Sequence, residues 1–214
     1  PLAPATINRY AAALGAVLSW SIKKRIAPQD WQNPCRRIER KVENNEVVRF
    51  LSDREREALL FECKRSSWSR LYLFVLIAIT TAARRGEVES LRWSDIDFEN
   101  AIATIPRQTK NGDGRVLPLV RAVIEELRKH IGAPTMLVFA SRRRPDVPYN
   151  HVPSWHKALR NAGVRNFRFH DLRHSCASYL AQSGATLVQI ADVLGHRNLS
   201  VTRRYAHLAT KHKS

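Results

Sequence analysis

The chain has 214 residues, and its 36 lysines and arginines against 19 aspartates and glutamates give it a formal net charge of +17. A charge of this size attracts polyanions, so we expect nucleic acid or an anionic membrane surface as the partner. Hydrophobic residues make up 44% of the chain, with only 8 glycines and 10 prolines. This composition excludes a disordered basic tail protein and favours a folded chain with a real core.

Two further features narrow the class of protein. The three cysteines, Cys35, Cys63 and Cys176, are too widely spaced for a disulfide framework or a Cys-x-x-Cys metal site, which favours a reducing compartment. The longest apolar run, residues 71–79, is far shorter than the ~20 residues that span a bilayer. We therefore expect a cytoplasmic protein without a membrane partner. Because the only methionine is Met136, we also expect the chain to be a piece of a longer protein.

The first part of the chain is predicted to contain one long helix and a linker. Apolar residues recur at helical spacing over residues 6–24, and the polar stretch 36–49 is typical of a linker. Ser52 and Glu55 then have the spacing of a capping box ahead of an apolar run, so a new helix and a new domain are expected to begin here. The predicted domains are residues 1–45 and 46–214.

The second domain is predicted to be mainly α with a small three-stranded antiparallel β-sheet, an α+β fold. Apolar residues alternate from Ile96 to Ile105 and again near Val116, and Asn111-Gly112 between them is a strong turn former. These residues predict the sheet, which is inserted among helices. The predicted helices cover residues 71–80, 85–92, 119–131, 153–161, 169–183, 186–194 and 202–208.

Two stretches place basic side chains where they can meet an anion. Arg84 precedes Arg85-Gly86-Glu87 at a predicted helix start, where a guanidinium and free backbone N–H groups can bind one phosphate. The alternative is an exposed ion pair between Arg84 and Glu87.

Lys110 lies on the predicted hairpin, from which it can act as a general acid or phosphate clamp. Hairpin tips also carry solvated lysines routinely, and this alternative stays open.

A third stretch is the helix predicted over residues 169–183. His170 and Arg173 lie one turn apart on the same side of it, so both are predicted to project toward one anionic group. The alternatives are a solvated basic face and a metal site formed by His170 and His174. The metal site is disfavoured, because a metalloprotease-type helix needs Glu directly after the first histidine and a third ligand, and Asp171 follows here.

The fourth stretch brings a histidine and a tyrosine close in sequence. Gly195 is expected to end a helix, so the imidazole of His196 can face a cleft at the bend. Tyr205 follows nine residues later, between Arg204 and His207. Three other tyrosines are predicted on apolar helix faces or in the core: Tyr10, Tyr72 and Tyr179. Tyr205 is the best candidate for a reactive phenol, which needs nearby cations or a base because its ordinary pKa is ~10.

Together these stretches resemble one family. They have the order and approximate spacing of tyrosine recombinase motifs: Arg84 with Glu87, Lys110, His170-x-x-Arg173, Leu194-Gly195-His196 and Thr202-x-x-Tyr205. The chain resembles the tyrosine recombinase, or phage integrase, family, with the catalytic domain over about residues 50–210 and the end of the core-binding domain in residues 1–45. One departure is Ala82, where the family usually has glycine. If this residue has positive φ, alanine costs about 1 kcal/mol.

The resemblance implies site-specific strand breakage and rejoining of DNA, without metal, ATP or any other cofactor. In the family pattern Arg84 and Arg173 would hold the scissile phosphate, and His196 would add a hydrogen bond. Tyr205 would be the nucleophile that leaves a 3′-phosphotyrosyl link and a free 5′-hydroxyl. The covalent link would retain the energy of the phosphodiester bond, so rejoining would need no ATP.

Three more residues and the partners also follow from the resemblance. Lys110 would protonate the leaving 5′-oxygen, His170 would act as acid or base on the tyrosine side, and Glu87 would orient its neighbours. The implied partner is double-stranded DNA at a specific recombination site, bound by a homotetramer with accessory directionality or bending factors. Such a protein is encoded by a bacterium or phage and associates with the nucleoid.

Two other functions are consistent with the same residues. A catalytically silent basic DNA-binding module would shift the mobility of DNA but form no covalent adduct. A metal-dependent phosphoesterase built on His170 and His174 would lose its activity with a chelator. The acidic residues are scattered along the chain, which argues against a two-metal nuclease.

Overall fold

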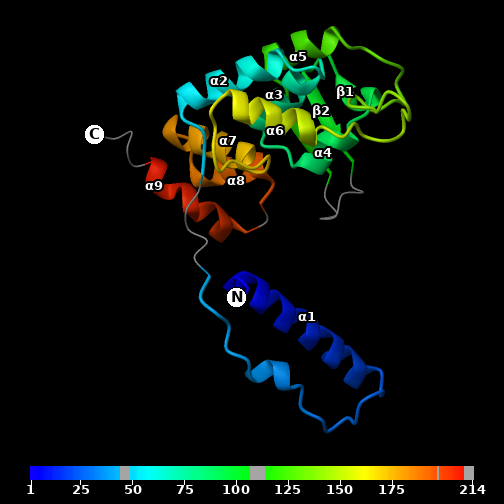
Figure 1. Ribbon diagram of the computed structural model, residues 1–214, viewed down its shortest axis with the longest axis vertical. Helices are drawn as coiled ribbons and strands as arrows, with labels where there is room; N and C mark the ends of the chain where they lie inside the picture. The colour runs from blue at the N-terminus through cyan, green and yellow to red at the C-terminus, as the bar shows by residue number, and fades with distance from the viewer. Residues whose placement is uncertain (44–48, 107–113, 197, 210–214) are drawn as a thin grey trace. The chain divides into compact units, whose positions relative to one another are not determined.

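The computed structural model describes residues 1–43, 49–106, 114–196 and 198–209. The chain forms two compact units, Pro1–Val47 and Val48–Ser214, which are described separately (Figure 1). The turn predicted at Asn111-Gly112 and the candidate residue Lys110 lie outside the described residues.

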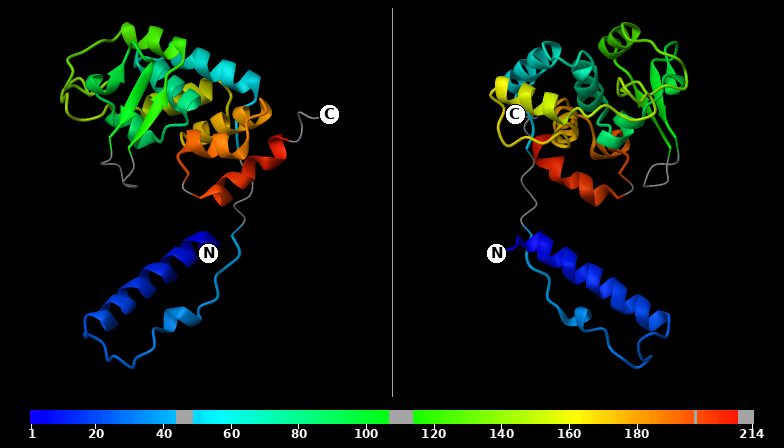
Figure 2. Two further views of the ribbon diagram at one scale, coloured as in Figure 1. Left: turned by 180° about the vertical axis from the view of Figure 1, so that it is seen from behind. Right: turned by 45° about the vertical axis from the view of Figure 1, so that its right-hand side comes forward.

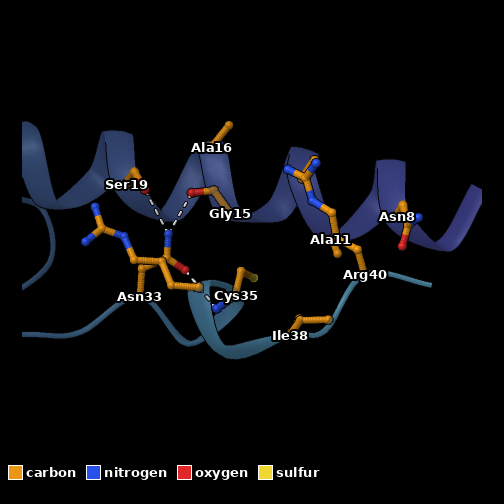
Figure 3. Close-up of a pocket in the computed structure, with 11 residues that line it drawn as sticks. Asn8, Ala11, Gly15, Ala16, Ser19, Asn33, Cys35, Ile38 and Arg40 are labelled. Atoms are coloured by element: carbon orange, nitrogen blue, oxygen red, sulfur yellow. Dashed lines mark hydrogen bonds between the residues drawn. The ribbon is translucent and has the colours of Figure 1, made fainter. Parts of the chain in front are cut away.

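The first unit consists of helix α1 (Pro4–Lys23) and a returning segment with a 3-10 turn, η1 (Pro34–Arg37). Asn33 holds the two together, because its Nδ2 donates to the Gly15 carbonyl oxygen at 2.7 Å and to Ser19 Oγ at 2.8 Å (Figure 3). A pocket lies along this contact, lined by small residues of α1 and by the returning segment. No residue of α1 is buried, and Tyr10 is 65% exposed, so the apolar face predicted for this helix is not covered within the unit.

The core of the second unit is built around helix α3 (Leu71–Thr81), whose sequence is almost wholly apolar and almost wholly buried. It packs against the neighbouring helices α2 (Asp53–Lys64), α5 (Arg121–Arg128) and α7 (Asp171–Gln182), while α2 also contacts α6 (Val152–Asn161) (Figure 1). The predicted capping box is confirmed, since Ser52 Oγ accepts from the Glu55 amide and the Glu55 carboxylate accepts from the Ser52 amide. Burial on all sides explains why α3 lacks a polar face.

The predicted sheet is confirmed as three antiparallel strands in the order β1, β2, β3 (Figure 2). Its strands are β1 (Ile96–Asp97), β2 (Ile102–Ile105) and β3 (Arg115–Pro118), and they follow helix α4 (Arg85–Ser90) and the 3-10 turn η2 (Trp93–Asp95). In register, Ile96 pairs with Ala103, and Ala103 with Leu117. One face of the sheet joins the core, because Ala103, Ile105 and Leu117 are buried.

The end of the chain folds over α7. Helix α8 (Leu187–Leu194) is followed by a 3-10 segment, η3 (Leu199–Tyr205), and by α9 (Ala206–Ala209), and all three contact α7. The helix predicted over residues 202–208 is therefore two short elements. A second apolar cluster joins these elements to the end of α3, and it includes Ala82, Cys176, Ile190, Leu194, Tyr205 and Leu208. Among the described helices, none is both long and apolar enough to cross a bilayer.

Candidate active site

Four of the predicted reactive side chains converge where α7 meets the ends of other elements. Arg84 is the residue that caps α4, Arg173 lies in the first turn of α7, His196 follows α8, and Tyr205 ends η3. These side chains are close enough to influence one another electrostatically. Burial lowers the pKa of His196, and the charges of Arg173 and Arg84 lower it further, to about 4. Arg173 likewise lowers the pKa of Tyr205, against a larger opposing effect of burial.

Arg173 is buried inside this cluster, at 4% exposure. Its Nη1 donates to the carbonyl oxygen of Ala82 at 2.7 Å, and its Nη2 donates to the carbonyl oxygen of Leu194. Burial, helped by the charges of Arg84 and Arg115, lowers its pKa to about 10, so it still carries its charge at neutral pH. A solvated basic helix face is therefore wrong for Arg173. His170, at the start of the same helix, is exposed.

Ala82 has φ +54° and ψ +24°, in the left-handed region that glycine favours. The departure noted in the sequence is therefore an alanine in a strained backbone conformation, at a cost of about 1–2 kcal/mol. This conformation ends α3 and turns the Ala82 carbonyl oxygen toward the guanidinium of Arg173. The loop thus helps to position a candidate catalytic arginine.

Glu87 organises the arginines on the other side of the site. It is 4% exposed, and Oε1 accepts from Arg84 Nη1 at 2.9 Å while Oε2 accepts from the Arg84 amide at 2.8 Å. Arg115 Nη2 donates to the same Oε2 at 2.6 Å. Burial raises the pKa of Glu87, but the hydrogen bonds and charges of the two arginines outweigh it, and the pKa lies below its ordinary value. The Arg84–Glu87 pair exists, with a buried Glu87 and a partly exposed Arg84.

Arg115 also belongs to the site, although no sequence motif indicated it. It lies in β3, and its Nη1 also donates to the Val193 carbonyl oxygen at 2.7 Å near the end of α8. The sequence shows a basic residue next to the hairpin, but only folding brings it into contact with Glu87, which lies 28 residues earlier in the chain. Arg115 thereby ties the sheet to both α4 and α8.

His196 is oriented by a buried threonine. Its Nδ1 lies 2.9 Å from Oγ1 of Thr202, which is fully buried in η3. A neutral imidazole that is held through Nδ1 presents Nε2 as its other hydrogen-bonding atom. His196 is thus joined through Thr202 to η3, the segment that carries Tyr205.

Tyr205 is 1% exposed, and its Oη lies 2.5 Å from Nδ1 of His174. Burial raises the pKa of this phenol to about 12, although the charges of Arg204 and Arg173 lower it in part. Tyr205 therefore lies in the same cluster as Arg173 and His174. Its hydrogen-bond partner is His174, a residue that the sequence suggested only as a metal ligand.

The rings of His170 and His174 have centroids 5.2 Å apart in an edge-to-face arrangement. Within the described part of the chain, no group of three or more histidines, cysteines, aspartates or glutamates is placed to hold a metal ion. The side chain of Asp171 bonds instead to Arg168, whose Nη2 donates to Oδ1 at 2.9 Å. The geometry therefore offers no support for a metal site on this helix.

The two site histidines predict how stability depends on pH. The pKa values of His174 and His196 are lowered to about 4, mainly by burial, whereas an unfolded histidine titrates near 6.5. Below 6.5 the unfolded chain binds protons that the folded chain does not, so these residues reduce stability as pH falls from 6.5 toward 4. The urea midpoint should fall in this window, and less steeply in the double variant with His174→Asn and His196→Asn. The exposed His156→Ala should keep the wild-type slope, and equal slopes in all three proteins would contradict the prediction.

The family of this chain follows from comparison with known proteins. Residues 49–212, which contain every candidate residue described above, match the phage integrase family. The chain belongs to the phage integrase family. The resemblance drawn from the five motifs is thereby confirmed.

The relatives of this integrase-family chain include two proteins of about twice the matched length. The integrase of Salmonella phage P22 is 33% identical over 181 residues, which cover 78% of this chain and 46% of the P22 protein. The shufflon-specific DNA recombinase of Escherichia coli is 30% identical over 192 residues, which cover 86% of this chain and 47% of that protein. The chain thus spans about half the length of the curated relatives it matches.

Solved structures of the same fold agree with this assignment. The catalytic domain of bacteriophage HP1 integrase superposes with a TM-score of 0.62 at 26% identity, covering 78% of this chain and 92% of that domain. The crystal structure of XerA recombinase has a TM-score of 0.65 at 22% identity, covering 99% and 83% of the two chains, and shares the fold. The predicted fold, mainly helical with a small antiparallel sheet, is confirmed.

Proposed function

We propose that this protein is a site-specific DNA recombinase that breaks and rejoins strands through a covalent 3′-phosphotyrosyl intermediate. The observation that carries the proposal is the convergence of the Tyr205 phenol with the buried Arg173 guanidinium, close to Arg84 and His196. A phenol near the Arg173 guanidinium, which itself lies near Arg84, is suited to attack a phosphodiester, because the cations stabilise the charge that develops on the phosphate. The names of the P22 and shufflon relatives support the same class of reaction.

The described residues would hold the scissile phosphate and stabilise its transition state. Arg84 and Arg173 would hold the non-bridging oxygens, with a further hydrogen bond from His196, and each such donor is worth about 10²–10³ in rate. Glu87 would keep Arg84 in place through its two hydrogen bonds. This arrangement requires no metal ion to neutralise the transition state.

The reaction balances without an energy source. Tyr205 Oη would form a bond to phosphorus while the bond from phosphorus to the 5′-oxygen breaks. The phenolic proton would leave toward the histidines of α7, where His170 is the expected acid or base, and Lys110 would give a proton to the 5′-oxygen. The reverse reaction with a different 5′-hydroxyl would join the strand to a new partner.

The partners follow from the same proposal. Double-stranded DNA at a specific site would be held by a homotetramer, with accessory directionality or bending factors, in the cytoplasm and on the nucleoid. Residues 141–214 hold 13 lysines and arginines against three acidic residues, which suits a phosphate backbone. Residues 1–45 would belong to a core-binding domain that grips the duplex, and residues 46–214 would form the catalytic domain.

A nicked suicide duplex that carries the cognate site tests this function. The wild-type protein should form a covalent adduct that survives denaturing electrophoresis, and EDTA should leave its yield unchanged. A shift of DNA mobility without an adduct would instead indicate a silent DNA-binding module. Cleavage that EDTA abolishes would indicate a metal-dependent phosphoesterase.

The glycine that ends α8 allows a prediction about how strongly the reaction depends on the backbone conformation at the site. Gly195 has φ +60°, and a Cβ there would lie 3.4 Å from Cδ of Arg115. We expect Gly195→Ala to cost about 1–2 kcal/mol in stability and to slow adduct formation by up to about 10²-fold, because the strained backbone would shift the adjacent His196. Denaturant unfolding and single-turnover cleavage measure the two effects.

Gly184→Ala is the matched control. Gly184 also has positive φ, +89°, but nothing lies within 4 Å of a Cβ placed there. This variant should lose stability to a similar or larger degree and still cleave at the wild-type rate. Equal loss of cleavage in both variants would mean that stability, not the position of His196, limits the reaction.

A further inference from the structure

His174 makes the direct contact with the candidate nucleophile. Its Nδ1 lies 2.5 Å from Oη of Tyr205, and the rings are tilted by 42° with centroids 6.1 Å apart. The contact joins α7 to the end of η3 across 31 residues. Both residues lie in a packed region, since Tyr205 is fully buried and His174 is half-buried between two buried neighbours, Arg173 and Ser175.

The surroundings keep this imidazole ready to accept a proton. Burial is the largest influence on His174, and it lowers the pKa to about 4, so the ring is neutral at neutral pH. The charged and titratable groups that act on it come from four segments: Asp171 of α7, Arg168 and the N-cap His170 before α7, His196 after α8, and Arg204 and Tyr205 of η3. In the neutral ring with Nε2 protonated, Nδ1 carries the lone pair, so the phenol donates and Nδ1 accepts.

We propose, on the basis of the recombinase function above, that His174 accepts the phenolic proton of Tyr205 as the phosphotyrosyl bond forms. His170, which the family pattern places on the tyrosine side, then acts as the neighbour of His174. Its ring centroid lies 5.2 Å from that of His174, while Tyr205 Oη lies within hydrogen-bonding distance of His174 itself.

The step is balanced in atoms and charge. As Oη of Tyr205 bonds to phosphorus, its proton moves to Nδ1 of His174, which becomes an imidazolium beside the anionic phosphotyrosyl diester. The 5′-oxygen departs with a proton from the opposite side. Because the phenolic oxygen becomes far more acidic as it bonds to phosphorus, a neutral imidazole can take the proton although the free phenol has the higher pKa. In rejoining, His174 returns the proton to Oη.

Substitution with asparagine separates proton transfer from simple orientation. The Oδ1 of an asparagine can occupy the place of Nδ1 and accept a hydrogen bond from Tyr205, but it cannot take up a proton. We expect both His174→Ala and His174→Asn to slow single-turnover adduct formation by about 10²–10⁴-fold, with DNA affinity and melting temperature of His174→Asn close to wild type. If His174→Ala fails to fold, His174→Asn carries the test alone. The exposed His156→Ala on α6 is the control histidine and should leave the rate unchanged.

A modified substrate tells the two sides of the phosphate apart. A duplex with sulfur in place of the bridging 5′-oxygen has a leaving group that departs without a proton. It should restore cleavage by Lys110→Ala, which serves the leaving group, but not by His174→Asn. The pH–rate profile adds a readout: the wild-type rate should fall as the pH drops toward about 4, where His174 becomes protonated, and this acidic limb should be absent in His174→Asn.

Three results would overturn the assignment of His174. They are cleavage by His174→Asn within about threefold of wild type, rescue of this variant by the sulfur-bridged duplex, or an acidic limb that persists in it and vanishes in His170→Asn. The failure of the recombinase function would look different. In that case the wild-type protein itself would form no adduct on either duplex.

Discussion

Tyr205→Phe is expected to abolish the covalent DNA adduct, lowering the rate of its formation by at least about 10³-fold. The substitution removes Oη and nothing else from a side chain that is 1% exposed, so the ring still fills the cluster between α7 and α8. The loss of the hydrogen bond to His174 should cost only about 1 kcal/mol in stability. Denaturing electrophoresis on the suicide duplex measures the adduct, and a mobility shift under native conditions should show unchanged DNA binding.

Tyr179→Phe is the matched control for this prediction. Its hydroxyl donates to the carbonyl oxygen of Leu51 at 3.0 Å and belongs to the junction of α7 with the start of the second unit. Removing it should cost a comparable amount of stability and leave adduct formation at the wild-type rate. An adduct that persists in Tyr205→Phe, or one that is lost equally in Tyr179→Phe, would refute the assignment of the nucleophile.

Arg173→Ala should combine a catalytic and a structural loss. The rate of adduct formation should fall by about 10²–10³-fold, because the phosphate loses the guanidinium group that would stabilise its negative charge. Stability should fall by about 1–3 kcal/mol, because the carbonyl oxygens of Ala82 and Leu194 lose their buried donor. Single-turnover cleavage and urea unfolding measure the two losses independently.

Arg173→Lys and Arg121→Ala are the conservative variant and the control for this prediction. A lysine keeps the charge but cannot span both carbonyl oxygens with one ammonium group, so it should regain part of the stability and little of the rate. Arg121 is an exposed arginine of α5 that pairs with Glu125 at 2.7 Å, and its removal should leave both stability and the rate close to wild type. Full activity of Arg173→Lys would mean that charge alone, without the bridging geometry, suffices.

The order of the elements could be predicted from the sequence because its signals are local. The capping box at Ser52 and Glu55 fixed the start of α2. Gly184 and Gly195 have the positive φ expected of residues that end helices. The alternation from Ile96 to Ile105 located the sheet. Each signal depends on neighbours within a few residues, so it can be recognised in the sequence of a single chain.

The apolar face of α1 shows where such reasoning stops. Its helical spacing predicted the helix correctly, but Tyr10 and Val17 are more than half exposed. Periodicity shows which residues share a face, whereas whether anything covers that face depends on the rest of the assembly.

By itself the sequence determined the family, the fold class and the identity of most candidate site residues, because these are carried by spacing along the chain. Only the tertiary structure decided that Arg173 is buried between the ends of α3 and α8, that Arg115 bonds to Glu87, and that His174 contacts Tyr205. These contacts join residues 21 to 91 positions apart. They form only when packing brings separate helices together, which is the information that periodicity and spacing lack.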